Sequence, residues 1–163
     1  MNSINGCPRI KSVYRQDPLF KIFEIQISII FAGIVSCVHI TDLKGPTVIE
    51  TGSELLLDCD FDYLEEEESQ LDLKWYFNRS PIPVYQWVPS MNKGPQVIGE
   101  LFKNSLDLEY EAHNDTFKKH RALRIINTDH RFSGTYQCKV SSFVDEDFMQ
   151  KEILVYGKIR ISN

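Results

Sequence analysis

The sequence predicts an all-β fold, a sandwich of two sheets, on the basis of three features. Apolar and polar residues alternate over short segments, as they do in strands with one buried face. Gly, Pro, Asn and Asp separate these segments at short intervals, where turns are expected. Two cysteines, Cys59 and Cys138, lie far apart in the body of the chain. No stretch predicts a long amphipathic helix.

The predicted strands follow one another at short spacing. In the first, residues 54–60, the side chains of Leu55, Leu57 and Cys59 share one face. A similar alternation in residues 71–77 predicts a second strand. Further strands are expected at residues 84–88, 96–102, 106–110, 122–126, 134–140 and 148–156.

The body of the chain is acidic. Of the formal net charge of −5, the four basic and two acidic residues up to Cys37 contribute +2, which leaves −7 for the remainder. Such a surface repels phosphate backbones, so nucleic acid is not an expected partner. Residues 64–70 include four consecutive glutamates, Glu65 to Glu68, and are expected to form a solvated loop because they are too charged to be buried.

The first 37 residues have the order of a signal peptide. Four basic residues precede the apolar run from Ile27 to Val38, and the small residues Ser36 and Cys37 fit a cleavage site after Cys37. The run is shorter than the roughly 18–20 apolar residues of a spanning helix. The alternatives are a buried core helix and a signal anchor that is not cleaved. We therefore expect a leader (1–37), a domain (38–157) and a short tail (158–163).

The use of cysteine agrees with export. Cys7 and Cys37 belong to the predicted leader, so the mature chain keeps Cys59 and Cys138. Two distant cysteines in an exported chain are expected to form one disulfide. Neither belongs to a closely spaced cysteine pair, so the sequence does not predict a zinc site.

Cys59, Trp75 and Cys138 resemble the immunoglobulin fold in their order and spacing, and Tyr136 lies two residues before Cys138 in the motif Ser-Gly-Thr-Tyr-Gln-Cys. The resemblance implies that the disulfide joins the two sheets and that Trp75 packs on it in the core. It also implies that the Tyr136 hydroxyl binds the backbone of the turn before its strand, the arrangement called the tyrosine corner.

The wide separation of the cysteines resembles the variable type of this fold, with Greek-key connections and an added edge strand at 84–88 beside the Trp75 strand. Phe132 stands where the family usually has an aspartate that pairs with an arginine. Packing or Asp129 is expected to replace that salt bridge. More narrowly, residues 73–76 followed by 85–89 resemble insect cell-surface proteins of the beaten-path kind. This resemblance implies adhesion or axon guidance through partners that also carry immunoglobulin domains.

Two regions are candidate partner-binding sites. If the sheet that holds Trp75 and Cys138 meets a partner, its aromatic residues are candidate anchors. For Tyr85 and Trp87, the alternative is that they cover their own sheet. The segment between the last two strands has aromatic residues flanking three acids, and either meets a basic partner or is merely solvated. The candidates are Tyr76, Tyr85 and Trp87 in the sheet, and Phe143, Asp145, Glu146 and Asp147 in the segment.

Asn114 and Asn78 begin glycosylation sequons, and Asn114 is the better candidate because Pro81 follows the Asn78 sequon. The four histidines are scattered, no glycine-rich phosphate loop occurs, and the carboxylates lie in segments expected to be solvated. The sequence therefore predicts no enzyme, catalytic residue, cofactor or metal site.

Together these features predict a secreted or cell-surface recognition module. Its expected partner is another extracellular immunoglobulin-domain protein or a second copy of the chain, and membrane attachment would require a longer isoform or an uncleaved leader. The alternative is a secreted humoral factor that binds a microbial or small ligand. A concave apolar pocket between the sheets would favour this alternative, whereas a flat aromatic face would favour the first.

Overall fold

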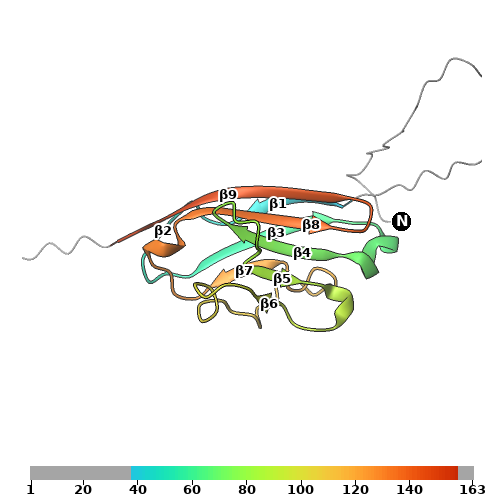
Figure 1. Cartoon of the computed structure of the whole chain (residues 1–163), viewed down its shortest axis with the longest axis horizontal. Coiled ribbons are helices and arrows are strands. Elements are labelled where there is room, and N and C mark those ends of the chain that lie inside the picture. Colours follow the sequence, from blue (N-terminus) through green and yellow to red (C-terminus); the bar gives the residue numbers. More distant parts are fainter. Residues whose placement is uncertain (1–37, 158–163) are drawn as a thin grey trace, which may run out of the picture.

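Two sheets make up the part of the chain that the computed structural model describes, residues 38–157 (Figure 1). The predicted leader with its cleavage site and the predicted tail lie outside the described residues. The back sheet has the order β1 (His39–Lys44), β3 (Leu55–Asp62), β7 (Ala122–Ile125). The front sheet has the order β2 (Val48–Glu50), β9 (Glu146–Tyr156), β8 (Gly134–Ser141), β4 (Asp72–Phe77), β5 (Tyr85–Trp87), β6 (Gln96–Val97).

Neighbouring strands are antiparallel except β2 and β9, which run parallel. The chain crosses from one sheet to the other on either side of β2, between β3 and β4, and on either side of β7, as in Greek-key sandwiches. The predicted fold class is confirmed, and the predicted edge strand at 84–88 is found as β5 beside β4.

Two predicted strands are wrong in whole or in part. Residues 106–110 form only one isolated bridge, between Leu106 and Ile125, and the strand expected at 96–102 ends at Val97. The chain turns after Val97, and the ring of Phe102 enters the core with 2% of its surface exposed. Strands β1 and β2 were not predicted.

The prediction of a solvated loop at residues 64–70 is also corrected. It forms the 3₁₀ helix η1 (Glu65–Gln70) in place of an open loop, and Glu67 is buried. Two further 3₁₀ turns, η2 (Pro89–Met91) and η3 (His130–Phe132), lie on the connections before β6 and β8.

The disulfide between Cys59 and Cys138 joins β3 of the back sheet to β8 of the front sheet, as predicted. Trp75 lies directly opposite Cys138 in the β4–β8 pairing and is fully buried. Its indole N–H donates to the carbonyl oxygen of Arg121 at 3.2 Å, so the polar edge of the ring is satisfied inside the core.

The tyrosine corner is present. The Tyr136 hydroxyl donates to the carbonyl oxygen of Phe132 at 2.8 Å, and burial raises the pKa of this phenol above its ordinary range. Phe132 packs edge-on against Phe102, with ring centroids 5.5 Å apart. Of the two expected replacements for the missing aspartate, packing is therefore the one found.

Asp129 instead caps η3, because its carboxylate accepts from the backbone N–H of Arg131 at 2.8 Å and also pairs with the Arg131 guanidinium. These hydrogen bonds lower the pKa of Asp129 to about 2. The Arg131 side chain has the larger effect and the Arg131 backbone N–H the smaller. The depressed pKa means that the pair stabilises the fold above the ordinary pKa of 3.8, and that this contribution is lost as the pH falls toward 2.

We predict that an NMR titration of the Asp129 carboxyl carbon has its midpoint near pH 2. Arg131→Ala should raise the midpoint toward 3.8, because the guanidinium is lost while the backbone N–H remains. A midpoint that is the same in both proteins would contradict this account of the cap.

Replacing both cysteines by alanine (Cys59→Ala with Cys138→Ala) should lower the free energy of unfolding by about 4 kcal/mol, the chain-entropy value for a loop of this length. Urea denaturation of the two proteins measures the difference. The original protein in reducing buffer is the control and should lose a similar amount of stability. An unchanged midpoint in the double variant would contradict the assigned role of the disulfide.

Candidate functional site

The outer face of the back sheet is covered by ion pairs. Arg121 is buried, and its guanidinium binds Asp58 at 2.8 and 3.0 Å and also binds Asp60. Burial alone would raise the pKa of Asp60, but the charge of Arg121, with those of Lys118 and Lys44, holds it below its ordinary value. The charges of this cluster therefore compensate one another.

The outer face of the front sheet combines ion pairs with polar and apolar side chains. Its central side chains alternate with the buried residues of the same strands. Lys74 and Lys139 lie directly opposite each other and pair with Asp72 and Glu146 respectively. The side chains that define this outer face are Asp72, Lys74, Tyr76, Gln86, Gln137, Lys139, Phe148, Gln150 and Glu152.

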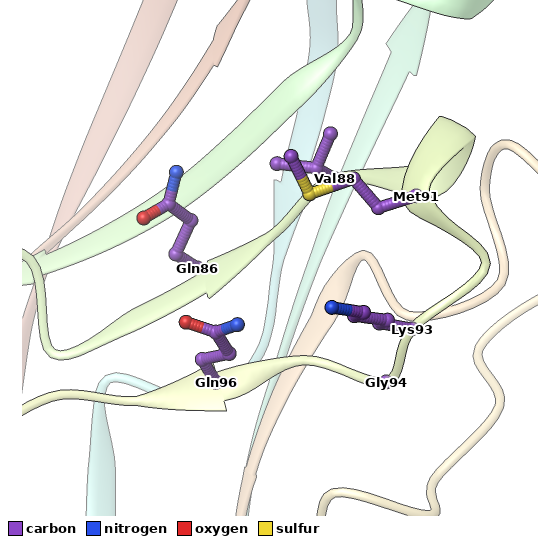
Figure 2. A pocket seen from close by; sticks show the side chains of 6 residues that line it. All are labelled: Gln86, Val88, Met91, Lys93, Gly94 and Gln96. Carbon is purple, nitrogen blue, oxygen red and sulfur yellow. The ribbon is translucent and has the colours of Figure 1, made fainter.

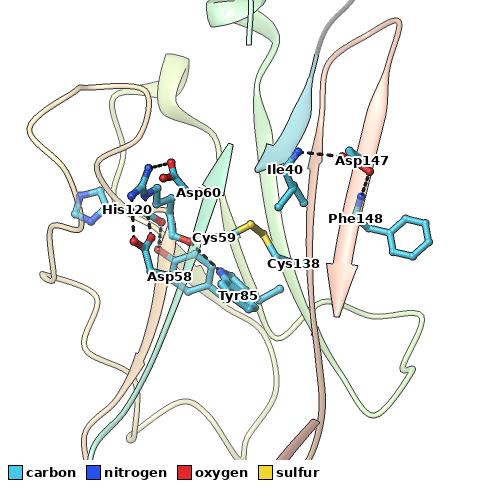
Figure 3. The surroundings of a disulfide bond; sticks show 11 residues. Ile40, Asp58, Cys59, Asp60, Tyr85, His120, Cys138, Asp147 and Phe148 are labelled. Carbon is cyan, nitrogen blue, oxygen red and sulfur yellow. Dashed lines mark hydrogen bonds and ion pairs between the residues drawn. A yellow bond between two sulfur atoms is a disulfide. The ribbon is translucent and has the colours of Figure 1, made fainter. Parts of the chain in front are cut away.

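Tyr85 and Trp87 do not belong to this face, which corrects the expectation that they anchor a partner. Only 2% of Tyr85 and 4% of Trp87 is exposed, because both point into the sandwich. The Tyr85 hydroxyl donates to the carbonyl oxygen of His120 at 2.7 Å, and Trp87 packs edge-on against the His120 ring, with centroids 5.4 Å apart. In Figure 3, Tyr85 lies nearer to the disulfide than His120 does. Both residues cover their own sheet, which was the alternative interpretation.

Tyr76 takes the outward position that was predicted for it. It lies on β4 between the inward-facing Trp75 and Phe77 and opposite Gln137 of β8, with a half-buried side chain. An aromatic residue at this place gives the outer face an apolar element close to its centre.

The turn between β8 and β9 presents its aromatic residue to solvent. Phe143 is 85% exposed, and Val144 is exposed beside it. The turn is nevertheless closed by hydrogen bonds: the Ser142 N–H donates to the Asp145 carbonyl oxygen at 2.8 Å, and the Asp145 N–H donates to the Ser142 hydroxyl at 3.2 Å. Phe148 follows Asp147 on β9, and its side chain lies on the opposite, exposed face of the strand. It points away from the disulfide (Figure 3).

Glu67 fixes this turn to η1. The side chain is 4% exposed, and its two carboxylate oxygens accept from different partners: the Leu64 N–H at 2.9 Å and the Ser142 hydroxyl at 3.0 Å. Gln70 adds a further link, because its side-chain oxygen accepts from the Phe143 N–H at 3.3 Å. The buried carboxylate therefore positions the exposed Phe143.

The three acids beside this turn differ in their surroundings. The Asp147 carboxylate accepts from the Ile40 N–H and contacts the His39 ring nitrogen, both at 2.9 Å, and so holds the start of β1 against β9 (Figure 3). Glu146 pairs with Lys139 at 2.6 Å. Asp145 is half-buried within the turn. Glu146 and Asp147 of the predicted acidic segment therefore have partners within the domain, and Asp147 has a structural role.

Two solved structures share this arrangement of strands. The crystal structure of the human B7-H4 IgV-like domain matches with a TM-score of 0.54 and 15% identity, over 72% of this chain and 97% of that one. The fold is immunoglobulin-like. Extracellular domains 3–5 of Drosophila OTK match this immunoglobulin-like chain with a TM-score of 0.52 and 17% identity, over 72% of its length but only 35% of theirs. No family model and no curated protein matches the sequence.

Both predicted sequons of the immunoglobulin-like domain are exposed. Asn114 lies on the loop before β7. Asn78 lies at the end of β4 with a φ of 51°, and its side-chain oxygen accepts from the Thr135 N–H at 3.0 Å. Gly134 is required here, because a Cβ atom at this position would overlap the Asn78 side chain. Asn114 is the less constrained of the two, and glycosylation of either stays a prediction.

Within residues 38–157, no helix has the length and apolar character needed to cross a lipid bilayer. Over the same residues, no three side chains of His, Cys, Asp or Glu come together as a metal site would require.

We predict that Glu67→Ala loosens the Phe143 turn, because the Leu64 N–H and the Ser142 hydroxyl lose their acceptor. Chymotrypsin should then cleave after Phe143 several times faster than in the original protein, and the free energy of unfolding should fall by about 1–3 kcal/mol. Peptide mapping by mass spectrometry and urea denaturation measure the two effects.

The neighbouring exposed glutamate supplies a matched control. Glu66→Ala removes the same charge from the same 3₁₀ helix and should leave cleavage after Phe143 unchanged. If the Glu67 and Glu66 variants are cleaved at the same rate, Glu67 does not hold the turn.

Proposed function

We propose that this domain is an extracellular protein-recognition module that binds its partner with the Phe143 turn and the adjoining outer face of the front sheet. The observation that carries the proposal is an almost fully exposed phenylalanine on a turn fixed by a buried carboxylate. A large aromatic side chain gains much apolar burial on binding, and a turn whose backbone is already fixed needs little further ordering.

The charge around the turn indicates the kind of partner. Glu65 and Glu66 are exposed on η1, which the Glu67–Ser142 hydrogen bond holds beside Phe143. Figure 1 shows η1 and the β8–β9 turn at the same end of the domain. We infer that the partner surface has an apolar depression for Phe143 and a basic rim, because opposite charges at the edge of an interface speed and orient association.

The packing between the sheets supports a protein partner over a small ligand. A secreted factor for small ligands was expected to have a concave apolar pocket there, but Trp75, Phe102 and Tyr136 fill the space around the disulfide. The two hollows described for the domain lie at its surface, one at the β5–β6 edge and the other bordered by η1 and η2.

The narrower assignments rest on resemblance. The likeness to extracellular domains of Drosophila OTK and the sequence resemblance to beaten-path proteins support a role at cell surfaces, in adhesion or axon guidance. We accordingly propose that the partner is another extracellular immunoglobulin-domain protein, and that a second copy of this chain is the alternative to test beside it.

The experiment is a binding screen of the secreted protein against an array of extracellular immunoglobulin-domain proteins that includes the protein itself. For a specific partner, we expect Phe143→Ala to weaken binding at least tenfold, as truncation of an interface anchor does. Surface plasmon resonance measures the affinity.

Ile82→Ala is the matched control, because Ile82 is also a large exposed apolar residue but lies on the turn between β4 and β5. It should bind like the original protein. Full affinity of the Phe143 variant for the partner would show that the Phe143 turn is not the binding site.

A further inference from the structure

A hollow of about 220 Å³ lies on the side of the front sheet where β5 and β6 form its edge. Gln86 of β5 and Gln96 of β6 are directly paired and border it together. The connection between the two strands turns back at Asn92, whose φ of 51° is left-handed, and so brings the residues after it over the same hollow. Its lining residues are Gln86, Val88, Met91, Lys93, Gly94 and Gln96.

The lining combines one cation with amide and apolar groups. Figure 2 shows the Lys93 side chain extending across the hollow toward the space between the two glutamines, with Val88 and Met91 at one end. The Gln86 amide nitrogen donates to Asp72 at 3.0 Å, which holds that side chain in place. The Gln96 amide is exposed, so it can donate to a bound group.

Lys93 differs in its partners from Lys74 and Lys139, the two lysines of the outer face. Lys74 pairs with Asp72 and Lys139 pairs with Glu146, whereas Lys93 makes no ion pair with any residue in the described chain. An ammonium group that faces amide groups and an apolar wall matches a carboxylate on a short aliphatic stem. The volume suits one side chain, since pockets for whole small molecules usually exceed about 300 Å³.

We infer that this hollow binds a glutamate side chain of a protein partner. The carboxylate accepts from the Lys93 ammonium and the Gln96 amide, and the methylene groups of the glutamate pack on Val88 and Met91. The identity of the partner rests on the proposed function, but the recognition of the carboxylate does not. The site shares no residue with the Phe143 turn, although η2, which carries Met91, packs against η1.

The test is an NMR titration of the domain with N-acetyl-glutamic acid amide, which is a capped glutamate. We expect shifts of the Met91 methyl group and the Gln96 side-chain amide at millimolar ligand. Capped glutamine, which has the same shape without the charge, should cause much smaller shifts. Lys93→Met should abolish the response, and Lys103→Met, which removes an exposed lysine elsewhere, should retain it.

The absence of shifts, equal shifts with capped glutamine, or an undiminished response in Lys93→Met would overturn the inference, provided that both variants melt like the original protein. Binding of capped glutamate without any protein partner in the screen would uphold the carboxylate site and count against the proposed function. A partner that binds Lys93→Glu as tightly as the original protein would count against the hollow alone.

Discussion

The contact between the disulfide and Trp75 is the constraint on which the rest of this domain depends. The bridge fixes β3 against β8, and Trp75 fills the adjacent space on β4. The segment before β7 then supplies carbonyl oxygens to Trp75 and Tyr85, which keeps both rings inside the sandwich. Because Trp75 of β4 and Tyr85 of β5 are used in this way, Tyr76 is the aromatic side chain that these two strands present on the outer face.

The sequence allowed much of the fold to be predicted, because its decisive signals are local. Cys59, Trp75, Tyr136 and Cys138 occupy spacings that few other folds require. Alternation alone was less reliable: Leu106 and Leu108 alternate, yet they only pack against the core from a turning segment. Conversely, β1 escaped prediction because a bulge between Ile40 and Asp42 breaks the alternation of its buried residues.

The candidate site was harder to predict, because it depends on orientation rather than on residue type. Alternation places Tyr85 and Trp87 on one face of their strand, but only the pairing with β4 determines that this face points inward. Residue type could not distinguish Glu67 from the glutamates on either side of it. The one available signal was its position three residues after Leu64, from which a side chain at the start of a helical turn can reach back to the backbone.

The parallel pairing of β2 with β9 has a mechanical consequence. The described chain begins at one end of the long axis and leaves β9 at the other (Figure 1), so tension between them runs along the strands. Such a load shears the hydrogen bonds between β2 and β9 together, including those from Leu154 to Thr47 and from Thr51 to Tyr156, instead of opening them one at a time. Asp147 of β9 also accepts from the Ile40 N–H, so the start of β1 is fastened to the same strand.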